Sequence, residues 1–259
     1  MQVHELRCFG AHPGQGNVAL VIENGPVSQA ERQAWASAQN KGACLFLTPA
    51  NAGMYEADYY YPHARSPLCL HATLAAAHIL CARGPATLRT AMRGQLLPLS
   101  HDATGAFAAV RRQAVAPIGI APGLAAHLLG EPDLVLASAP LLSSVGSPKL
   151  LIEVLDAAAL HALRPPLERI VDWGKDNGVS GCYVYCRTGD AAYEGRNFNH
   201  LDPALEDCAT GVAAGALSAW LGHGLTMLQG HALGNPCRIV TRVDGDTIFV
   251  GGATELRIH

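Results

Sequence analysis

The chain has 259 residues, which suits one large domain or two of roughly 120–130 residues. Its formal net charge of −3 disfavours a nucleic-acid partner, and 49% hydrophobic residues are ample for a core. No uninterrupted apolar run is long enough to cross a bilayer, and MQVHELRCFG resembles a strand rather than a signal peptide. We therefore expect no membrane partner and a cytoplasmic location.

The first half of the chain reads as strands interrupted by two helices. A Ser-x-x-Glu capping box at Ser28 and Glu31 predicts an amphipathic helix over 28–39. A second, alanine-rich helix is expected over 71–83. Strands are expected over residues 3–8, 18–23, 44–47, 54–61, 87–92, 94–99 and 106–111.

The second half repeats this order. A helical stretch over 157–178 is broken by Pro165-Pro166, and an alanine-rich helix is expected over 210–222. The chain ends in hairpin strands with Asp-Gly as the turn. Strand-like segments occupy residues 134–146, 149–155, 181–188 and 192–199.

The repeat suggests an internal duplication. Aligning Cys69 with Cys208 also aligns two pairs of alanines, although alanine is abundant and two buried helices need small residues in any case. We expect an N-terminal domain over 1–114 and a C-terminal domain over 115–259, whose last strand crosses back to the first domain.

The eight cysteines form no CxxC pair, so no structural zinc site and no metal are expected. Without an export signal they should remain reduced. Cys182 and Cys186 alternate along one strand and should share a core-facing side. Cys8, Cys81 and Cys237 lie in similarly apolar runs and have the same interpretation.

Cys69 and Cys208 differ, because each stands immediately before an alanine-rich helix. A helix N-terminus has unpaired N–H donors and a partial positive charge, which favour a thiolate and also bind a carboxylate. If the two halves face each other, one cleft holds a substrate carboxylate with a sulfur on each side of its α-carbon. Such a pair suits racemisation, in which one group removes the α-proton and the other returns a proton. The helix-end amides would stabilise the developing enolate, and no cofactor is needed.

Several segments resemble the PhzF-like phenazine-biosynthesis proteins, within the diaminopimelate epimerase-like superfamily that includes proline racemases. They are FGAHPGQGNVALVI, LCLHATLAAAHIL, SVGSPKLLIEV, SGCYVY, GRNFNHLDPALEDCATGVAAGAL, LQGHALGNP and VGGATELRI. The resemblance implies an α+β fold of two similar domains, each a β-roll or barrel around a central helix, with the site between them.

Two departures from the family pattern bear on function. PhzF-like isomerases carry a catalytic glutamate where this chain has Ala43, and replacement of that base by Cys44 is improbable. They carry proline where this chain has Cys208, the position of the second cysteine in the superfamily's two-cysteine racemases. The first cysteine of those enzymes aligns with Cys69.

The resemblance also implies substrate-binding residues. His71 matches the family's active-site histidine, Asp207 matches a substrate-contacting aspartate, and Asn17 matches a superfamily position that orients the substrate. Packing or capping roles are the alternatives for His71 and Asp207. Arg196 is the family arginine, which binds substrate or pairs with an acidic neighbour. First-turn donors are expected from Leu70, Ala72, Thr73, Ala209, Thr210 and Gly211.

The sequence thus predicts a cofactor-independent amino-acid racemase or epimerase with Cys69 and Cys208 as opposed acid and base. One alternative is a PhzF-like isomerase that moves a proton within an unsaturated small acid, using His71 and Asp207. Another is a non-catalytic metabolite-binding relic. The expected partner is a small carboxylate, and the resemblance is compatible with a homodimer.

Overall fold

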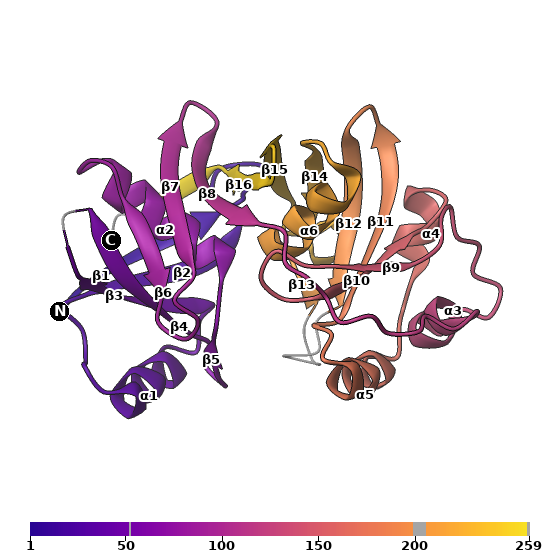
Figure 1. The fold of residues 1–259 in the computed structure, drawn as a ribbon, viewed down its shortest axis with the longest axis horizontal. Helices are drawn as coiled ribbons and strands as arrows, with labels where there is room; N and C mark the ends of the chain where they lie inside the picture. Colours follow the sequence, from indigo (N-terminus) through magenta and orange to yellow (C-terminus); the bar gives the residue numbers. More distant parts are fainter. Residues whose placement is uncertain (52, 199–205, 258–259) are drawn as a thin grey trace. The chain divides into compact units, whose positions relative to one another are not determined.

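The computed structural model describes residues 1–51, 53–198 and 206–257. The chain divides into two compact units, which we call the first and second unit (Figure 1). The first unit is Met1–Val110 together with the end of the chain from Phe249 onward, and the second is Arg111–Ile248. The chain re-enters the first unit within β16 (Thr247–Gly252).

Ten strands of the described chain contribute to the first unit. They are β1 (Gln2–Cys8), β2 (Asn17–Glu23), β3 (Ala43–Pro49), β4 (Met54–Tyr60), β5 (Arg65–Ser66), β6 (Thr87–Thr90), β7 (Leu96–Asp102), β8 (Gly105–Arg111), β16 and β17 (Thr254–Leu256). β2 and β3 are parallel, as are β4 and β6, whereas the pairs β1–β17, β1–β2, β3–β4, β4–β5, β6–β7 and β7–β8 are antiparallel. β8 also pairs with β16.

The strands of the first unit surround helix α2 (Leu70–Cys81), which packs against β1, β2, β3, β7 and β17. Ten of its twelve residues are buried. A helix that is apolar on all sides belongs inside a protein, and its alanines let the strands approach it closely.

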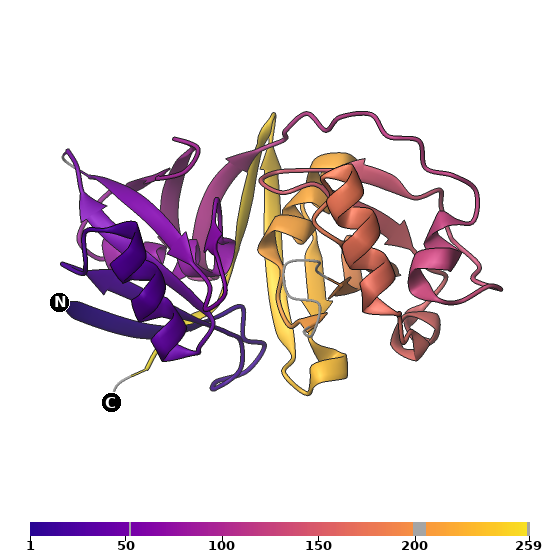
Figure 2. The same ribbon diagram turned by 90° about the horizontal axis from the view of Figure 1, so that it is seen from below.

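Helix α1 (Gln29–Gln39) lies on the outside of β3 and β4, and Figure 2 shows it in indigo across these strands. The predicted capping box is confirmed, because Ser28 accepts a hydrogen bond from the Glu31 backbone and Glu31 bonds back to the Ser28 backbone. Cys44 is buried in the small apolar cluster beneath α1, beside Phe46 and Tyr60.

The second unit is built from β9 (Leu141–Ser143), β10 (Lys149–Glu153), β11 (Cys182–Gly189), β12 (Ala192–Phe198), β13 (Glu206–Asp207), β14 (Thr226–Gln229) and β15 (Cys237–Asp244). β10 and β11 are parallel, as are β12 and β14, and β11–β12, β12–β13 and β14–β15 are antiparallel. This is the pairing scheme of β2, β3, β4, β5, β6 and β7 repeated strand for strand. The duplication therefore extends to the whole topology.

Helix α6 (Gly211–Leu221) is the counterpart of α2 and packs against β9, β10 and β15. The predicted break at the two prolines is confirmed, since α4 (Ala157–Ala162) ends before them and α5 (Leu167–Asn177) follows them. Cys182 and Cys186 both lie in the apolar cluster with α4 and α5 residues, as predicted. A short helix, α3 (Leu124–Leu129), was not predicted.

The α+β class predicted from the sequence is confirmed, with two similar units of strands around a central helix. Most predicted strands and the long helices recur with ends shifted by a few residues, but the strand predicted over 134–146 is reduced to β9. No helix within the described residues is long and apolar enough to span a membrane.

A buried charge cluster ties α1 to the sheet of the first unit. The carboxylate of Asp58, 2% exposed, accepts from Arg32 at 2.9 Å, Arg65 at 2.8 Å and the Tyr60 hydroxyl at 3.0 Å. We predict that Asp58→Ala lowers the free energy of unfolding by about 3–5 kcal/mol, because it leaves two half-buried guanidinium groups without their buried partner. Urea denaturation measures this.

The matched control is Glu56→Gln, which removes an exposed ion pair to Arg89 at 3.3 Å. It should cost less than about 1 kcal/mol. Equal losses for the two variants would contradict a structural role for the Asp58 cluster.

Candidate active site

Cys69 is the N-cap residue of α2, as its position before the helix predicts. Its backbone carbonyl accepts from the Thr73 amide at 3.0 Å and from the Thr73 hydroxyl at 2.8 Å. The Tyr59 hydroxyl lies 2.7 Å from the Thr73 hydroxyl. Thr73 therefore fixes the start of the helix, a structural role in addition to the expected first-turn donor.

The Cys69 thiol lies against the imidazole of His71. Its sulfur is 3.3 Å from Nδ1 and 3.5 Å from Nε2, and the imidazole packs edge-on to the ring of Tyr61. A proton can pass between a thiol and an imidazole in such a contact, so the geometry supplies Cys69 with an adjacent acid–base partner. Cys69 is 2% exposed.

Other predicted residues of the first unit lie close to the start of this helix. Asn17 opens β2 and pairs with Cys8 in the β1–β2 ladder. Burial and the nearby Cys69 raise the pKa of the Cys8 thiol, and the same two causes raise the pKa of Cys44 to about 12. Thiolate formation is thus disfavoured at Cys8 and Cys44, and burial also raises the pKa of Cys81 at the far end of α2. Cys69, at the start of the helix, is the candidate nucleophile or base of this unit.

Cys208 does not stand directly before its helix, and here the prediction from the sequence is wrong. The N-cap of α6 is Thr210, and the helix begins at Gly211. The reason is local: the Asp207 carboxylate accepts from the Thr210 hydroxyl at 2.6 Å and from the Ala209 amide at 3.4 Å. This turn sets the cysteine two residues before the N-cap.

Gln229 holds this turn in place from β14. Its side-chain amide donates to the Asp207 carbonyl at 2.6 Å and to the Thr210 hydroxyl at 3.2 Å. Its carbonyl oxygen accepts from the Thr210 amide at 3.2 Å and from the Tyr183 hydroxyl at 3.1 Å. These four bonds of one buried side chain therefore determine where the Cys208 segment lies.

Cys208 is half-buried, and its sulfur accepts from the Asn235 side chain at 3.3 Å. A hydrogen bond with Cys237, burial and the Asp207 carboxylate all raise the pKa of the Cys208 thiol. Thiolate formation at Cys208 is therefore disfavoured in this conformation.

A buried polar face underlies the Cys208 segment. Tyr183 pairs with Asn197, and Asn197 pairs with Asp207, so these three side chains lie on one face of the sheet. Lys149 lies on the same face, because it is two residues before Leu151, the β10 partner of Tyr183. The Lys149 ammonium donates to the Ser180 carbonyl. Burial lowers its pKa to about 8, although the nearby Asp207 and Cys182 oppose the shift.

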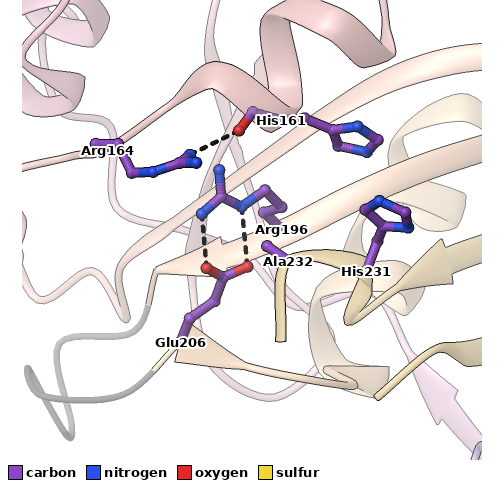
Figure 3. Close-up of a pocket in the computed structure, with 6 residues that line it drawn as sticks. All are labelled: His161, Arg164, Arg196, Glu206, His231 and Ala232. Carbon is purple, nitrogen blue, oxygen red and sulfur yellow. Dashed lines mark hydrogen bonds and ion pairs between the residues drawn. The ribbon is translucent and has the colours of Figure 1, made fainter. Parts of the chain in front are cut away.

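The sequence left the role of Arg196 open, and the structure resolves it in favour of an acidic partner. Its Nε and Nη2 donate to the Glu206 carboxylate at 3.0 and 2.7 Å, and its Nη1 donates to the carbonyls of Leu160 and Leu163 (Figure 3). Arg196 is 6% exposed and is committed to these contacts. It therefore anchors β13, the two-residue strand that leads into Cys208.

The predicted residues thus form one group in each unit. Cys69, Leu70, His71, Ala72 and Thr73 lie at the N-terminal end of α2, and Asp207, Cys208, Ala209, Thr210 and Gly211 at that of α6. Within the described residues, the side chains of the N-cap residues Cys69 and Thr210 accept no hydrogen bond from a first-turn amide. This leaves their first turns without the usual capping group.

Comparison with known proteins identifies the family. Residues 6–253 match the phenazine biosynthesis-like proteins, PhzC-PhzF. The chain belongs to this family. An uncharacterized isomerase of Deinococcus radiodurans is 32% identical over 270 residues, covering 93% of this chain and 86% of that protein.

Solved structures extend the likeness to epimerases. A predicted epimerase from Pseudomonas aeruginosa is 26% identical, with a TM-score of 0.79 over 99% of this chain and 96% of that one. A hydroxyproline epimerase from Agrobacterium vitis, solved with trans-4-hydroxy-L-proline, shares the fold at 12% identity, with a TM-score of 0.61 over 100% of this chain and 91% of that one. The PhzC-PhzF chain is thus related to named isomerases and has an epimerase-like fold.

Sequence reasoning missed three residues of the PhzC-PhzF chain that shape the second group: Lys149, Gln229 and Asn235. Lys149 carried a readable signal, because a lysine that begins an apolar strand must find a buried partner. Gln229 ends a short strand, and nothing in its sequence environment indicates four simultaneous hydrogen bonds.

The pKa of Cys208 leads to a testable prediction for this PhzC-PhzF protein. Cys237→Ala removes the largest cause of the raised pKa, so the thiolate fraction of Cys208 and its alkylation rate should increase several-fold near pH 8. Peptide mass spectrometry after timed iodoacetamide exposure measures the rate at each cysteine. Cys81→Ala, which changes another half-buried cysteine, should leave the alkylation rate of Cys208 unchanged. An alkylation rate of Cys208 that is the same in wild type and in Cys237→Ala would refute the assigned cause of the raised pKa.

Lys149 leads to a prediction about pH. Its pKa of about 8 is below the unfolded value near 10.4, so between these values the unfolded chain binds one more proton than the folded chain. Wild type should therefore gain stability relative to Lys149→Met as pH rises from 8 to 10, by up to about 1.4 kcal/mol per pH unit.

Urea denaturation of both proteins across this pH range tests the Lys149 prediction. Lys175→Met, at an exposed position on α5, controls for loss of a lysine. A stability difference between wild type and Lys149→Met that stays constant with pH would show that Lys149 keeps its ordinary pKa in the folded protein.

Proposed function

We propose that this protein is a cofactor-independent racemase or epimerase of amino acids, in which Cys69 and Cys208 are the two acid–base groups. The observation that carries the proposal is the pair of cysteines at the N-terminal ends of α2 and α6, the equivalent central helices of the two units. Ala43 at the position of the PhzF glutamate removes the competing base. The 26% identical predicted epimerase supports the reaction class.

The proposed reaction moves one proton onto the substrate for each proton it removes. The Cys69 thiolate takes the α-proton on one face, the electron pair passes into the substrate carboxylate as an enediolate, and the Cys208 thiol protonates the opposite face. The raised pKa of Cys208 fits its role as the donor in this direction. The reverse direction starts with the two protonation states exchanged.

His71 supports the base in this scheme. Its imidazole contacts the Cys69 sulfur at 3.3 Å and can take up the thiol proton before substrate deprotonation. First-turn amides of α2 and α6, which within the described residues are not capped by the side chains of Cys69 and Thr210, are the proposed donors to the substrate carboxylate and the enediolate. One removed oxyanion donor typically costs roughly 100- to 1,000-fold in kcat, so this positioning matters as much as the thiols.

Deuterium exchange at the α-carbon tests the proposal. Purified protein is incubated in D₂O with each L- and D-amino acid, proline and 4-hydroxyproline included because of the Agrobacterium vitis neighbour, and exchange and inversion are followed by NMR. Cys69→Ser and Cys208→Ser should each lower inversion at least about 100-fold, the scale of general acid–base catalysis. Each should retain exchange with at most one enantiomer.

Cys81→Ser at the end of α2 is the control and should keep wild-type rates. Absence of exchange with every amino acid tried, in a protein that circular dichroism shows to be folded, would contradict the proposal. So would full activity of the Cys69→Ser, Cys208→Ser double variant.

A second candidate is a PhzF-like isomerase that moves a proton within one unsaturated acid through His71 and Asp207. The contact between His71 and Cys69 and the isomerase name of the Deinococcus radiodurans relative favour it. In this case His71→Asn would abolish proton transfer while the double cysteine variant retained it. A metabolite-binding relic, by contrast, would bind ligand but exchange no proton in any of these proteins.

A further inference from the structure

A pocket of about 360 Å³ lies in the second unit, on the outer side of β12 and β13. Its lining residues come from α4 and the segment after it, from these two strands and from η1 (His231–Leu233), and are drawn in Figure 3: His161, Arg164, Arg196, Glu206, His231 and Ala232. The volume falls in the range that holds small metabolites. Five of the six side chains are ionisable.

The geometry points to a binding site for a small oxyanion, a phosphate or a carboxylate group, in this pocket. The fixed charges of the lining sum to one positive charge, because Glu206 neutralises Arg196 and Arg164 remains. Among the described lining residues there is no second carboxylate to repel an anion.

The donors for the anion are Arg164 and His231. Arg164 uses Nη1 for the carbonyls of His161 and Leu163, so within the described residues its Nε and Nη2 have no protein acceptor. The His231 ring stacks on His161 with centroids 4.5 Å apart and planes at 9°, and within the same part of the chain neither of its nitrogens has a hydrogen-bond partner. The planar guanidinium fork of arginine suits the geometry of carboxylate and phosphate oxygens.

The remaining lining residues keep this arrangement rigid. His161 is held by Glu194, with Nε2 at 2.6 Å from the carboxylate, and so fixes the ring on which His231 stacks. Arg196 and Glu206 form the closed ion pair of the pocket floor. A metal is a poor fit, because no group of three His, Cys, Asp or Glu side chains among the described residues could hold one.

The pocket is distinct from the Cys208 segment although they share β13. Glu206 and Asp207 are consecutive and project to opposite faces of the strand, and Arg196 is likewise opposed to Asn197. An anion in the pocket therefore contacts none of the residues proposed for proton transfer.

Titration with inorganic phosphate, and separately with succinate, tests the site. Isothermal calorimetry gives the affinity, and ¹H–¹³C NMR follows the ring signals of His161 and His231. We expect saturable binding of at least one anion with a Kd below about 10 mM. A tenfold change in Kd corresponds to about 1.4 kcal/mol of binding free energy. The phosphate and succinate arms show which anion the site prefers.

Arg164→Met should weaken this binding at least tenfold, and His231→Leu should weaken it several-fold. Arg169→Met is the matched control, since Arg169 is another exposed arginine of the unit, bonded to a backbone carbonyl outside the pocket. No saturable binding of either anion would overturn the inference. Equal losses in Arg164→Met and Arg169→Met would also overturn it, because binding would then follow surface charge alone. Neither outcome bears on the cysteine mechanism, which is read from α-proton exchange.

Discussion

Each unit is organised by one helix that is buried on nearly all sides. α2 and α6 are stable when buried because most of their residues are alanine, glycine or leucine. Strands can therefore pack against them while few polar side chains need hydrogen-bond partners. Burial also constrains the helix ends, whose first amides have no intrahelical acceptor. The contacts that hold the chain where the two helices begin, Thr73 with Tyr59 and Gln229 with Asp207, position the cysteines and leave the first-turn amides without a side-chain cap.

Periodicity and turn chemistry predicted much of the fold. The capping box at Ser28, the proline break between α4 and α5 and the alternating cysteines of β11 were readable, because each depends on neighbours a few residues away. The family likeness added the roll topology. α3 was missed because its six residues are too few to show a helical period.

The residues of the candidate site can be named from the sequence, whereas their geometry is less predictable. Aligning Cys69 with Cys208 gives an offset of 139 residues between the two units. The observed offset is two residues larger, both between the starts of α2 and α6 and between Ser66 and Asp207, which pair with Tyr59 and Asn197. From Ser66 to the start of α2 and from Asp207 to the start of α6 the spacing is the same, so the longer spacing lies between Asn197 and Asp207, before the turn that Gln229 stabilises from another strand. Such a contact joins residues 22 apart in sequence and leaves no local pattern to read.

The shortness of β13 has a consequence for register. With only two residues, a slip of one position would carry Glu206 to the face of Asn197 and turn Asp207 outward, away from the amide of Ala209. In the described part of the chain this strand has only two ladder positions to hold its register. The bidentate ion pair of Arg196 with Glu206 therefore fixes the register. An arginine that touches no reacting atom thereby decides which way the neighbouring carboxylate faces.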